Sequence, residues 1–301
     1  MPKENTHLFF ARGLKEKLEN AELKKIIENN LSYYYLGAIS PDIFFYSVKE
    51  EERAISESLH GKNGEPTNKI VFEILDGAKD GKNDGKELAF LSGYLTHCAL
   101  DINFHPVIFP LTGNVFSENK GKKKIATYQH RYWETFLDWK LNDSVYFNEV
   151  VRTSLFSDLK FMDSLVSEFK IAPERFLYLV KKHALANRLI RKKWFYYFLF
   201  LLNRLGIYDK KEDLGAFYQD IKKGEQLIPE VIVYKDMKTG VNKKTSVGKL
   251  LAGSEKEAKE MILGAFRYYK NLIGKKELEI LIPGKSLDCG LLNCPIKSLK
   301  F

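Results

Sequence analysis

Cysteine is scarce in this sequence, and its scarcity argues against a disulfide-stabilised scaffold. Only three cysteines occur in 301 residues, and an odd number in a long chain does not suit a disulfide framework. Cys289 and Cys294 enclose the stretch CGLLNC, whereas Cys98 lies far away in the sequence. Without further cysteines at metal-ligand spacing, this pair is only a weak indication of a zinc ribbon or a redox centre.

Long apolar runs and a secretory leader are also lacking. The longest apolar run, WFYYFLFLL at 194–202, is shorter than the roughly 20 residues that a membrane-spanning helix needs. The first residues, MPKENTHLFFARGLKEK, lack the apolar core and small-residue cleavage site of a signal peptide. We therefore expect a cytoplasmic protein with no transmembrane segment.

The composition is that of a globular protein with a substantial core. Hydrophobic residues make up 45% and aromatic residues 13% of the chain, enough for one large domain or two small ones. The 48 Lys and Arg residues outnumber the 39 Asp and Glu residues, giving a net charge of +9. Such a surface favours anionic partners without identifying one.

Apolar residues recur at helical spacing over most of the chain, which predicts an all-α fold, a multi-helix bundle. The stretch ELAFLSGYLTHCALDINF, residues 87–104, is apolar almost all round, as in a central buried helix. Weak alternation at 230–245 allows one small hairpin around Gly240. The other predicted helices are 14–36, which should stop at Gly37, 124–141, 144–170, 173–205 with Pro173 in its first turn, and 254–273 with Ser254 as N-cap.

Five of the six histidines lie with acidic residues in the first 134 positions. In GYLTHCALDINFHP, His97, Asp101 and His105 are spaced by four, so a helix would place them on one face, about 5 to 6 Å apart. HRYWE repeats this spacing. The candidate metal ligands are His7, Asp42, His60, His97, Asp101, His105, His130 and Glu134. Imidazole and carboxylate without thiolate suit a zinc site with open positions.

Each candidate taken alone also has a purely structural explanation. His105 precedes Pro106 and could end a helix, Asp42 follows Pro41 and could form a turn or an N-cap, and His60 could be a cation at a helix C-terminus. The combination favours a metal, because Asp101 lies among apolar residues. A carboxylate buried there without a partner would cost several kcal/mol. More ligands are available than one tetrahedral zinc can use.

The ordered series of His7, Pro41-Asp42, His60-Gly61, GYLTHCALDINFHP and HRYWE resembles the bacterial zinc-dependent phospholipase C family. That family has an all-helical fold, which fungal and plant single-strand nucleases share. The resemblance covers residues 7 to about 134 and fades beyond. We expect residues 1–301 to form a single helical domain in which 1–145 carry the ligands and the helices of 146–301 complete the bundle.

The resemblance implies two or three zinc ions (Zn2+). Two of the implied sites would use Asp42, His60, His97 and Asp101 for one zinc, and His105, His130 and Glu134 for the other. In the family a third zinc uses the N-terminal amine, an early histidine and the bridging acid. His7 and Asp101 match two of those ligands, while the amine would come from Met1 or, after its removal, Pro2, where secreted members expose a tryptophan.

The implied activity is a zinc-dependent phosphodiester hydrolase, most like a phospholipase C. Bound zinc lowers the pKa of water from 15.7 to about 7, so a di- or trinuclear site would activate water for attack on phosphorus. Asp42 is the candidate catalytic residue that also orients this water, because in the family this acid borders the cleft.

The sequence leaves the substrate open. Residues 190–204, IRKKWFYYFLFLLNR, mix basic and aromatic residues as interfacial helices do, which would allow peripheral membrane contact; we favour a core helix with basic side chains that reach water. The less favoured alternative, a nuclease or small-phosphodiester hydrolase, would bind nucleic acid through basic residues and aromatic residues such as Tyr33 and Phe44, which we also expect in the core. A non-catalytic zinc-binding protein is the third alternative. No obligate protein partner is indicated.

Overall fold

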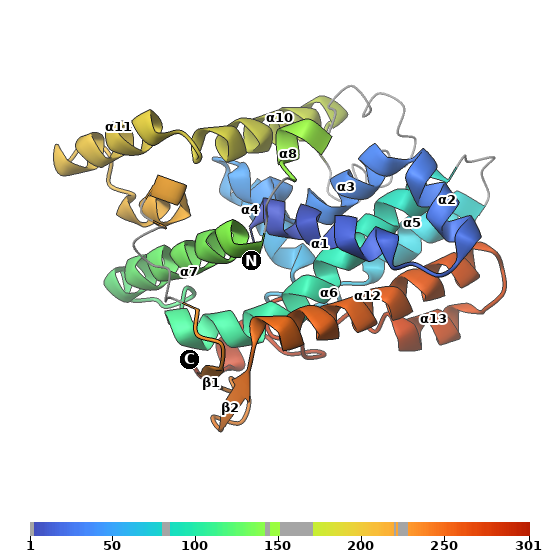
Figure 1. Ribbon diagram of the computed structural model, residues 1–301. Helices are drawn as coiled ribbons and strands as arrows, with labels where there is room; N and C mark the ends of the chain where they lie inside the picture. Colours follow the sequence, from blue (N-terminus) through green and yellow to red (C-terminus); the bar gives the residue numbers. More distant parts are fainter. Residues whose placement is uncertain (1–2, 80–84, 142–144, 151–170, 220, 222–227) are drawn as a thin grey trace.

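The computed structural model describes residues 3–79, 85–141, 145–150, 171–219, 221 and 228–301, and it is an all-α bundle around one central helix (Figure 1). This confirms the predicted fold class. The first half contains α1 (Glu4–Glu16), α2 (Ala21–Asn29), α3 (Leu31–Ile39), the 3-10 helix η1 (Ser40–Tyr46), α4 (Glu50–Leu59), α5 (Lys69–Lys79), α6 (Lys86–Thr112) and α7 (Lys120–Leu141). The rest contains α8 (Phe147–Val150), α10 (Pro173–Leu189), α11 (Lys193–Arg204), η3 (Lys211–Ala216), β1 (Ile232–Lys235), β2 (Asn242–Thr245), α12 (Val247–Tyr269), α13 (Lys275–Leu281) and η5 (Ile296–Ser298).

Helix α6 is the centre of the bundle. Almost all of its residues are buried, because α1, α2, α3, α5, α7 and α12 pack around it. The helix continues through Pro106 and Pro110 and ends at Gly113, which has a φ of 93°. The alternative in which His105 ends a helix is therefore wrong. A proline disfavours the helical conformation of the residue before it, but packing on all sides outweighs that local preference here.

Two glycines let α3 and α6 approach each other more closely than other residues would. A Cβ atom at Gly37 would lie 1.9 Å from the carbonyl oxygen of Phe90, and one at Gly93 would lie 1.8 Å from that of Tyr34. The expectation that a helix stops at Gly37 is wrong, since α3 runs to Ile39. Gly37 serves helix packing and does not end the helix.

The second half of the chain differs from the sequence prediction in its element boundaries. The predicted helix at 173–205 consists of α10, with Pro173 in its first turn as expected, and the separate helix α11. Helix α12 starts at Val247 with Ser246 as its N-cap, whereas Ser254 lies inside the helix and donates to the carbonyl of Leu250. Ser254 is thus not a cap. Of the predicted helix at 144–170, residues 151–170 lie outside the described residues.

The two strands form the expected small hairpin, in which Ile232 pairs with Thr245 and Lys235 with Asn242 in antiparallel register. Its turn includes Gly240, with a φ of 76°. Among the described helices, none combines the length and apolar character that crossing a bilayer requires.

Candidate metal centre

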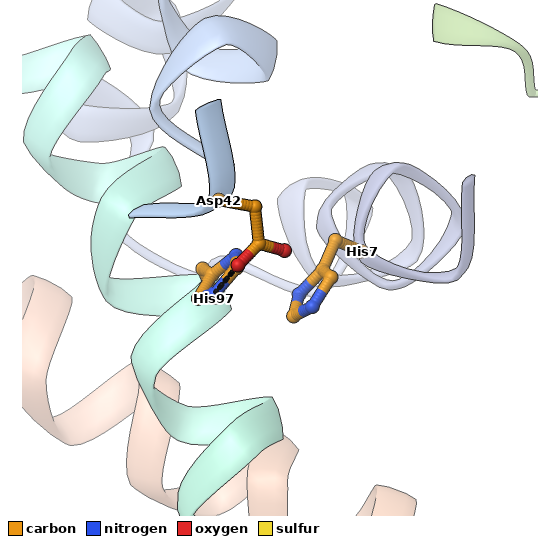
Figure 2. A group of neighbouring side chains, drawn as sticks. All are labelled: His7, Asp42 and His97. Atoms are coloured by element: carbon orange, nitrogen blue, oxygen red, sulfur yellow. Dashed lines mark ion pairs between the residues drawn. The ribbon is translucent and has the colours of Figure 1, made fainter. Parts of the chain in front are cut away.

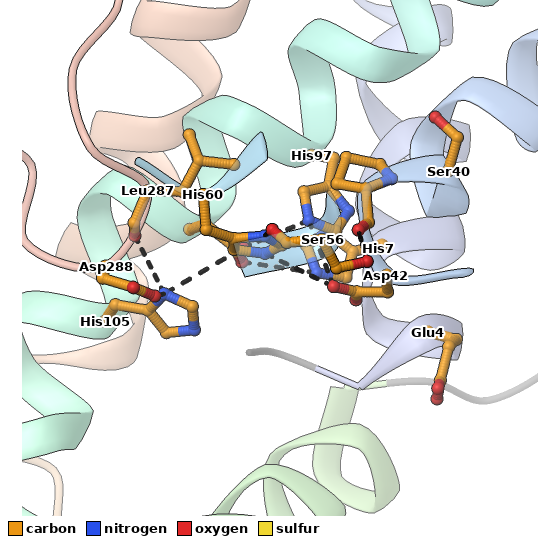
Figure 3. Close-up of polar contacts among 12 residues, drawn as sticks. Glu4, His7, Ser40, Asp42, Ser56, His60, His97, His105, Leu287 and Asp288 are labelled. Carbon is orange, nitrogen blue, oxygen red and sulfur yellow. Dashed lines mark hydrogen bonds and ion pairs between the residues drawn. The ribbon is translucent and has the colours of Figure 1, made fainter. Parts of the chain in front are cut away.

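Eight polar side chains from five segments converge beside α6. Figure 3 shows part of this cluster, with His7, Asp42, His60, His97 and His105 among the labelled residues. All eight are buried or nearly so. They are His7 from α1, Asp42 from η1, His60 directly after α4, His97, Asp101 and His105 from α6, and His130 and Glu134 from α7. These are the eight residues that the sequence pattern singles out, and the fold brings all of them together.

Asp101 lies at the middle of this cluster and is fully buried. Its Oδ2 is 3.1 Å from His97 Nε2 and 3.4 Å from His60 Nε2, while its Oδ1 is 3.4 Å from His7 Nε2. Asp42 adds a second carboxylate, with Oδ1 3.4 Å from His60 Nε2 and 3.9 Å from His97 Nε2. Two acids and three imidazoles therefore share one apolar-walled space.

Three of the histidines are held by the same kind of hydrogen bond. The Nδ1 atom of His60 lies 2.6 Å from the carbonyl oxygen of Ser56, that of His97 2.9 Å from Ala38 and that of His105 2.8 Å from Leu287. A carbonyl oxygen only accepts, so each Nδ1 must carry the proton and donate. Nε2 is then the atom of each ring that can bind a metal, which is how proteins orient metal-binding histidines.

The atoms that face one another in the cluster are therefore mostly hydrogen-bond acceptors. The Nε2 atoms of His60 and His97, Oδ1 of Asp42 and both carboxylate oxygens of Asp101 have no hydrogen-bond partner among the described residues. Facing lone pairs repel in an apolar interior, and unsatisfied buried polar groups are costly. A bound cation would convert this repulsion into coordination, so the donor set fits a metal ion such as zinc.

His7 completes this part of the cluster from the N-terminal helix (Figure 2). Its ring stacks on that of His97, with 3.8 Å between centroids. His7, Asp42 and His97 each offer a ligand atom within 4.8 Å of the others, and so do His60, His97 and Asp101. The two groups share His97 and therefore overlap in one cluster.

His105, His130 and Glu134 form a separate group whose ligand atoms also lie within 4.8 Å of one another. The rings of His105 and His130 are 5.9 Å apart, and His130 Nε2 is 2.8 Å from Glu134 Oε1. The spacing of four in α7 places imidazole and carboxylate on one face, as predicted. This face meets the end of α6 that carries His105, because α6 and α7 pack together.

A buried polar network fixes the start of α1, and with it the position of His7. His183 Nε2 donates to Glu4 at 2.8 Å, Asn187 donates to the other oxygen at 3.0 Å, and the Tyr46 hydroxyl also donates to Glu4. Against the effect of burial, these partners hold the pKa of Glu4 well below its ordinary value. His183 is thus a buried histidine held by Glu4 through Nε2, while its Nδ1 has no hydrogen-bond partner among the described residues.

The protonation states suit metal binding. Burial lowers the pKa of His7, His105 and His130, and neutral imidazole is the form that binds metals. Burial also lowers the pKa of His60, but the adjacent carboxylates of Asp101 and Asp42 outweigh this effect and raise it to about 10. The two acids therefore strongly favour a positive charge beside them.

The C-terminal segment makes contacts with the cluster that the sequence did not predict. The amide of Leu287 donates to the carbonyl of His60, and its carbonyl accepts from His105, so one residue links two of the converging histidines. The carboxylate of Asp288 lies 3.6 Å from His105 Nδ1, and burial raises its pKa to about 6. The spacing of residues in the sequence does not indicate these contacts, because they join positions that are 182 residues apart or more.

Other residues considered from sequence lie apart from the cluster. Cys98 is buried with a free thiol, as are Cys289 and the half-buried Cys294, and none belongs to a candidate metal group within the described part of the chain. Tyr33 and Phe44 are core residues, as expected.

Comparison with known proteins gave one match. The family model described as zinc dependent phospholipase C matches residues 6–172, more than half of the chain. This range includes all eight converging side chains. No curated protein and no solved structure matches the chain.

Proposed function

The chain belongs to the zinc-dependent phospholipase C family, and on that premise we propose that it hydrolyses phosphodiester bonds and that its substrates are phospholipids. The proposal is carried by one observation, the buried convergence of Asp42, His60, His97 and Asp101, whose facing atoms include carboxylate oxygens and imidazole Nε2 atoms without a hydrogen-bond partner among the described residues. The two carboxylates favour a positive charge between them, and the family uses zinc.

We assign the ligands in two groups, with a further contact from α1. Asp42, His60, His97 and Asp101 would hold one zinc; His105, His130 and Glu134 would hold a second. His7 and Asp101, with 3.4 Å between Nε2 and Oδ1, would contribute to a third. Support comes from the shared ligand distances and from the Nδ1 hydrogen bonds that aim the rings.

Zinc bound here would supply Lewis acidity, lowering the pKa of water and stabilising charge on the phosphate oxygens. The protein's own residues supply orientation. Asp42 comes from the short helix η1 and not from the central helix α6, and its Oδ1 has no hydrogen-bond partner among the described residues. We propose that this carboxylate accepts a proton from the attacking water and fixes its direction.

Phospholipid is preferred over single-stranded nucleic acid as the substrate. A nuclease of this kind would need exposed aromatic rings for base stacking near the site. Tyr33, Tyr34, Tyr35 and Phe44 are buried in the core. Phe45 and Tyr46 are half-buried, but Tyr46 is stacked on His183, so in this stretch Phe45, 5.3 Å from His60 between ring centroids, is the one ring beside the site, and one ring does not form a platform for successive bases. A small water-soluble phosphodiester stays an alternative, as does a non-catalytic zinc protein.

The first test is metal content by elemental mass spectrometry, followed by hydrolysis of a short-chain phosphatidylcholine, bis-p-nitrophenyl phosphate and single-stranded DNA. We expect two or three zinc ions per chain and the highest rate on the phospholipid. Asp42→Asn should abolish most activity while zinc is retained, and the exposed Asp209→Asn serves as the matched control. Full activity in Asp42→Asn would refute its role. Bound zinc with no hydrolysis of any substrate would favour the non-catalytic alternative.

A further inference from the structure

Helix α11 carries an apolar face that no part of the described protein covers. None of its residues is buried. Tyr197 and Phe198 follow Trp194 by three and four residues, Leu201 follows them by four and three, and Leu205 follows Leu201 by four. The five residues therefore form one stripe along the helix and its C-cap. Trp194 is 63% exposed and Leu201 53%. The expectation that this stretch is a core helix is wrong.

The opposite face of α11 is anchored, so the helix has a fixed orientation. Phe195 and Tyr196 pack on the buried ring of Phe217, at 5.9 and 5.6 Å between centroids. Phe217 directly follows η3, which packs along α7. The bare stripe therefore points away from the bundle, at the end of the molecule remote from α2 and α13 (Figure 1).

The chain between Glu174 and Asp209, which includes the stripe, carries charge of one sign. Residues 175–208 contain eight Lys and Arg residues and no Asp or Glu. Among the exposed ones, Lys181, Arg188, Lys192, Lys193 and Arg204 form no ion pair with an acid in the described part of the chain. Unpaired cations beside exposed aromatic rings suit a surface of anionic headgroups over an apolar layer.

The stripe is also connected to the candidate metal centre, through η3 and α7. Thr135 in α7 donates to the carbonyl of Gly215 in η3 at 3.1 Å, and Arg131 pairs with Asp213. In the same helix, Arg131 directly follows His130 and Thr135 directly follows Glu134. A surface bound through α11 is thus held at a fixed distance from the residues proposed to bind metal.

We propose that α11 is the element by which this protein docks on a lipid bilayer. The stripe from Trp194 to Leu205 inserts between headgroups at the depth where Trp and Tyr side chains are favoured, and Lys192, Lys193 and Arg204 contact lipid phosphates. This inference rests on the proposed phospholipase function, since docking would bring the substrate to the site. A bilayer is preferred over a second copy of the chain, because two such basic faces would repel each other.

The test is flotation of the purified full chain with phosphatidylcholine vesicles that contain phosphatidylglycerol. The variant Trp194→Ala/Phe198→Ala/Leu201→Ala should lower the vesicle partition coefficient by about 100-fold or more, since three large apolar side chains are lost. The control Val48→Ala/Leu272→Ala/Ile280→Ala removes three apolar side chains elsewhere that are each more exposed than those of the α11 variant, and it should bind like wild type. Binding of the wild type should also shift Trp194 emission to shorter wavelength, a shift that Trp194→Phe removes.

Activity on a monomeric short-chain phosphatidylcholine separates this inference from the function itself. We expect the α11 variant to hydrolyse the monomer at the wild-type rate and vesicles much more slowly. Equal vesicle binding by the two triple variants would overturn the docking role even if hydrolysis is found. Vesicle binding that depends on α11 in a protein without hydrolysis would support docking and refute the enzyme. The docking role would also be overturned if the wild type does not bind vesicles but forms a dimer in sedimentation equilibrium that only the α11 variant abolishes.

Discussion

Replacing Gly93 by alanine should force α3 and α6 apart. A Cβ atom there would lie 1.8 Å from the Tyr34 carbonyl oxygen. Side-chain carbons essentially never approach closer than 3.0 Å, so the helices must separate locally by about 1.2 Å, the difference between 3.0 and 1.8 Å. The obstacle is backbone and cannot rotate away. Overpacking costs about 1 to 3 kcal/mol, and we expect the upper end, a large part of a typical domain stability of about 5 to 15 kcal/mol.

The same separation should disturb the metal centre. His97 lies one turn after Gly93 in α6, and its Nδ1 donates across the helix interface to Ala38 at 2.9 Å. Moving the helices apart lengthens this bond and turns the ring away from Asp101. Gly93→Ala should therefore bind zinc more weakly as well as unfold at lower urea concentration.

Urea unfolding followed by circular dichroism, with chelator present, measures the packing contribution without metal. The matched control is Gly77→Ala in α5, where a Cβ atom would meet nothing within 4 Å. That variant should be more stable than wild type by about 0.5 to 1 kcal/mol, as expected for glycine within a helix. If Gly93→Ala unfolds at the same urea concentration as Gly77→Ala, the close packing of α3 on α6 is refuted.

Three further predictions concern the cluster and its surroundings. Chelation should lower the thermal midpoint and added zinc restore it, since each site filled at 1,000 times its Kd stabilises by about 4 kcal/mol; an unchanged midpoint would mean that the cluster binds no metal. Asp288→Asn should weaken zinc binding about tenfold, because Asp288 helps to orient His105, and zinc competition with a fluorescent chelator measures this. Wild-type affinity would show that the Leu287 carbonyl alone is enough to orient His105. Arg175 hydrogen-bonds Glu52 and lowers its pKa from 4.5 to about 2, so the stability advantage of wild type over Glu52→Gln should be complete above pH 4.5 and disappear as the pH falls toward 2; an advantage that is independent of pH would contradict the pairing.

The helical fold could be predicted from sequence because its signal is local and repeated. Apolar spacing identified the buried helix that became α6, and the spacing of four in α6 and α7 aligned His97 with Asp101 and His130 with Glu134. Boundaries were harder. Gly37 was expected to end a helix and Ser254 to begin one, but α3 continues through Gly37 and Ser254 lies inside α12. Both residues have a local preference that packing overrides.

The sequence by itself determined the helical class, the family resemblance and the residues capable of binding metal. These depend on residue type and on spacing within one helix, which a single chain displays directly. The tertiary structure alone decided that α11 turns its aromatic face outward, because periodicity defines a face without saying what covers it. It also decided that Leu287 links His60 to His105 of α6, since contacts between distant segments depend on how the helices pack and leave no trace in the local sequence.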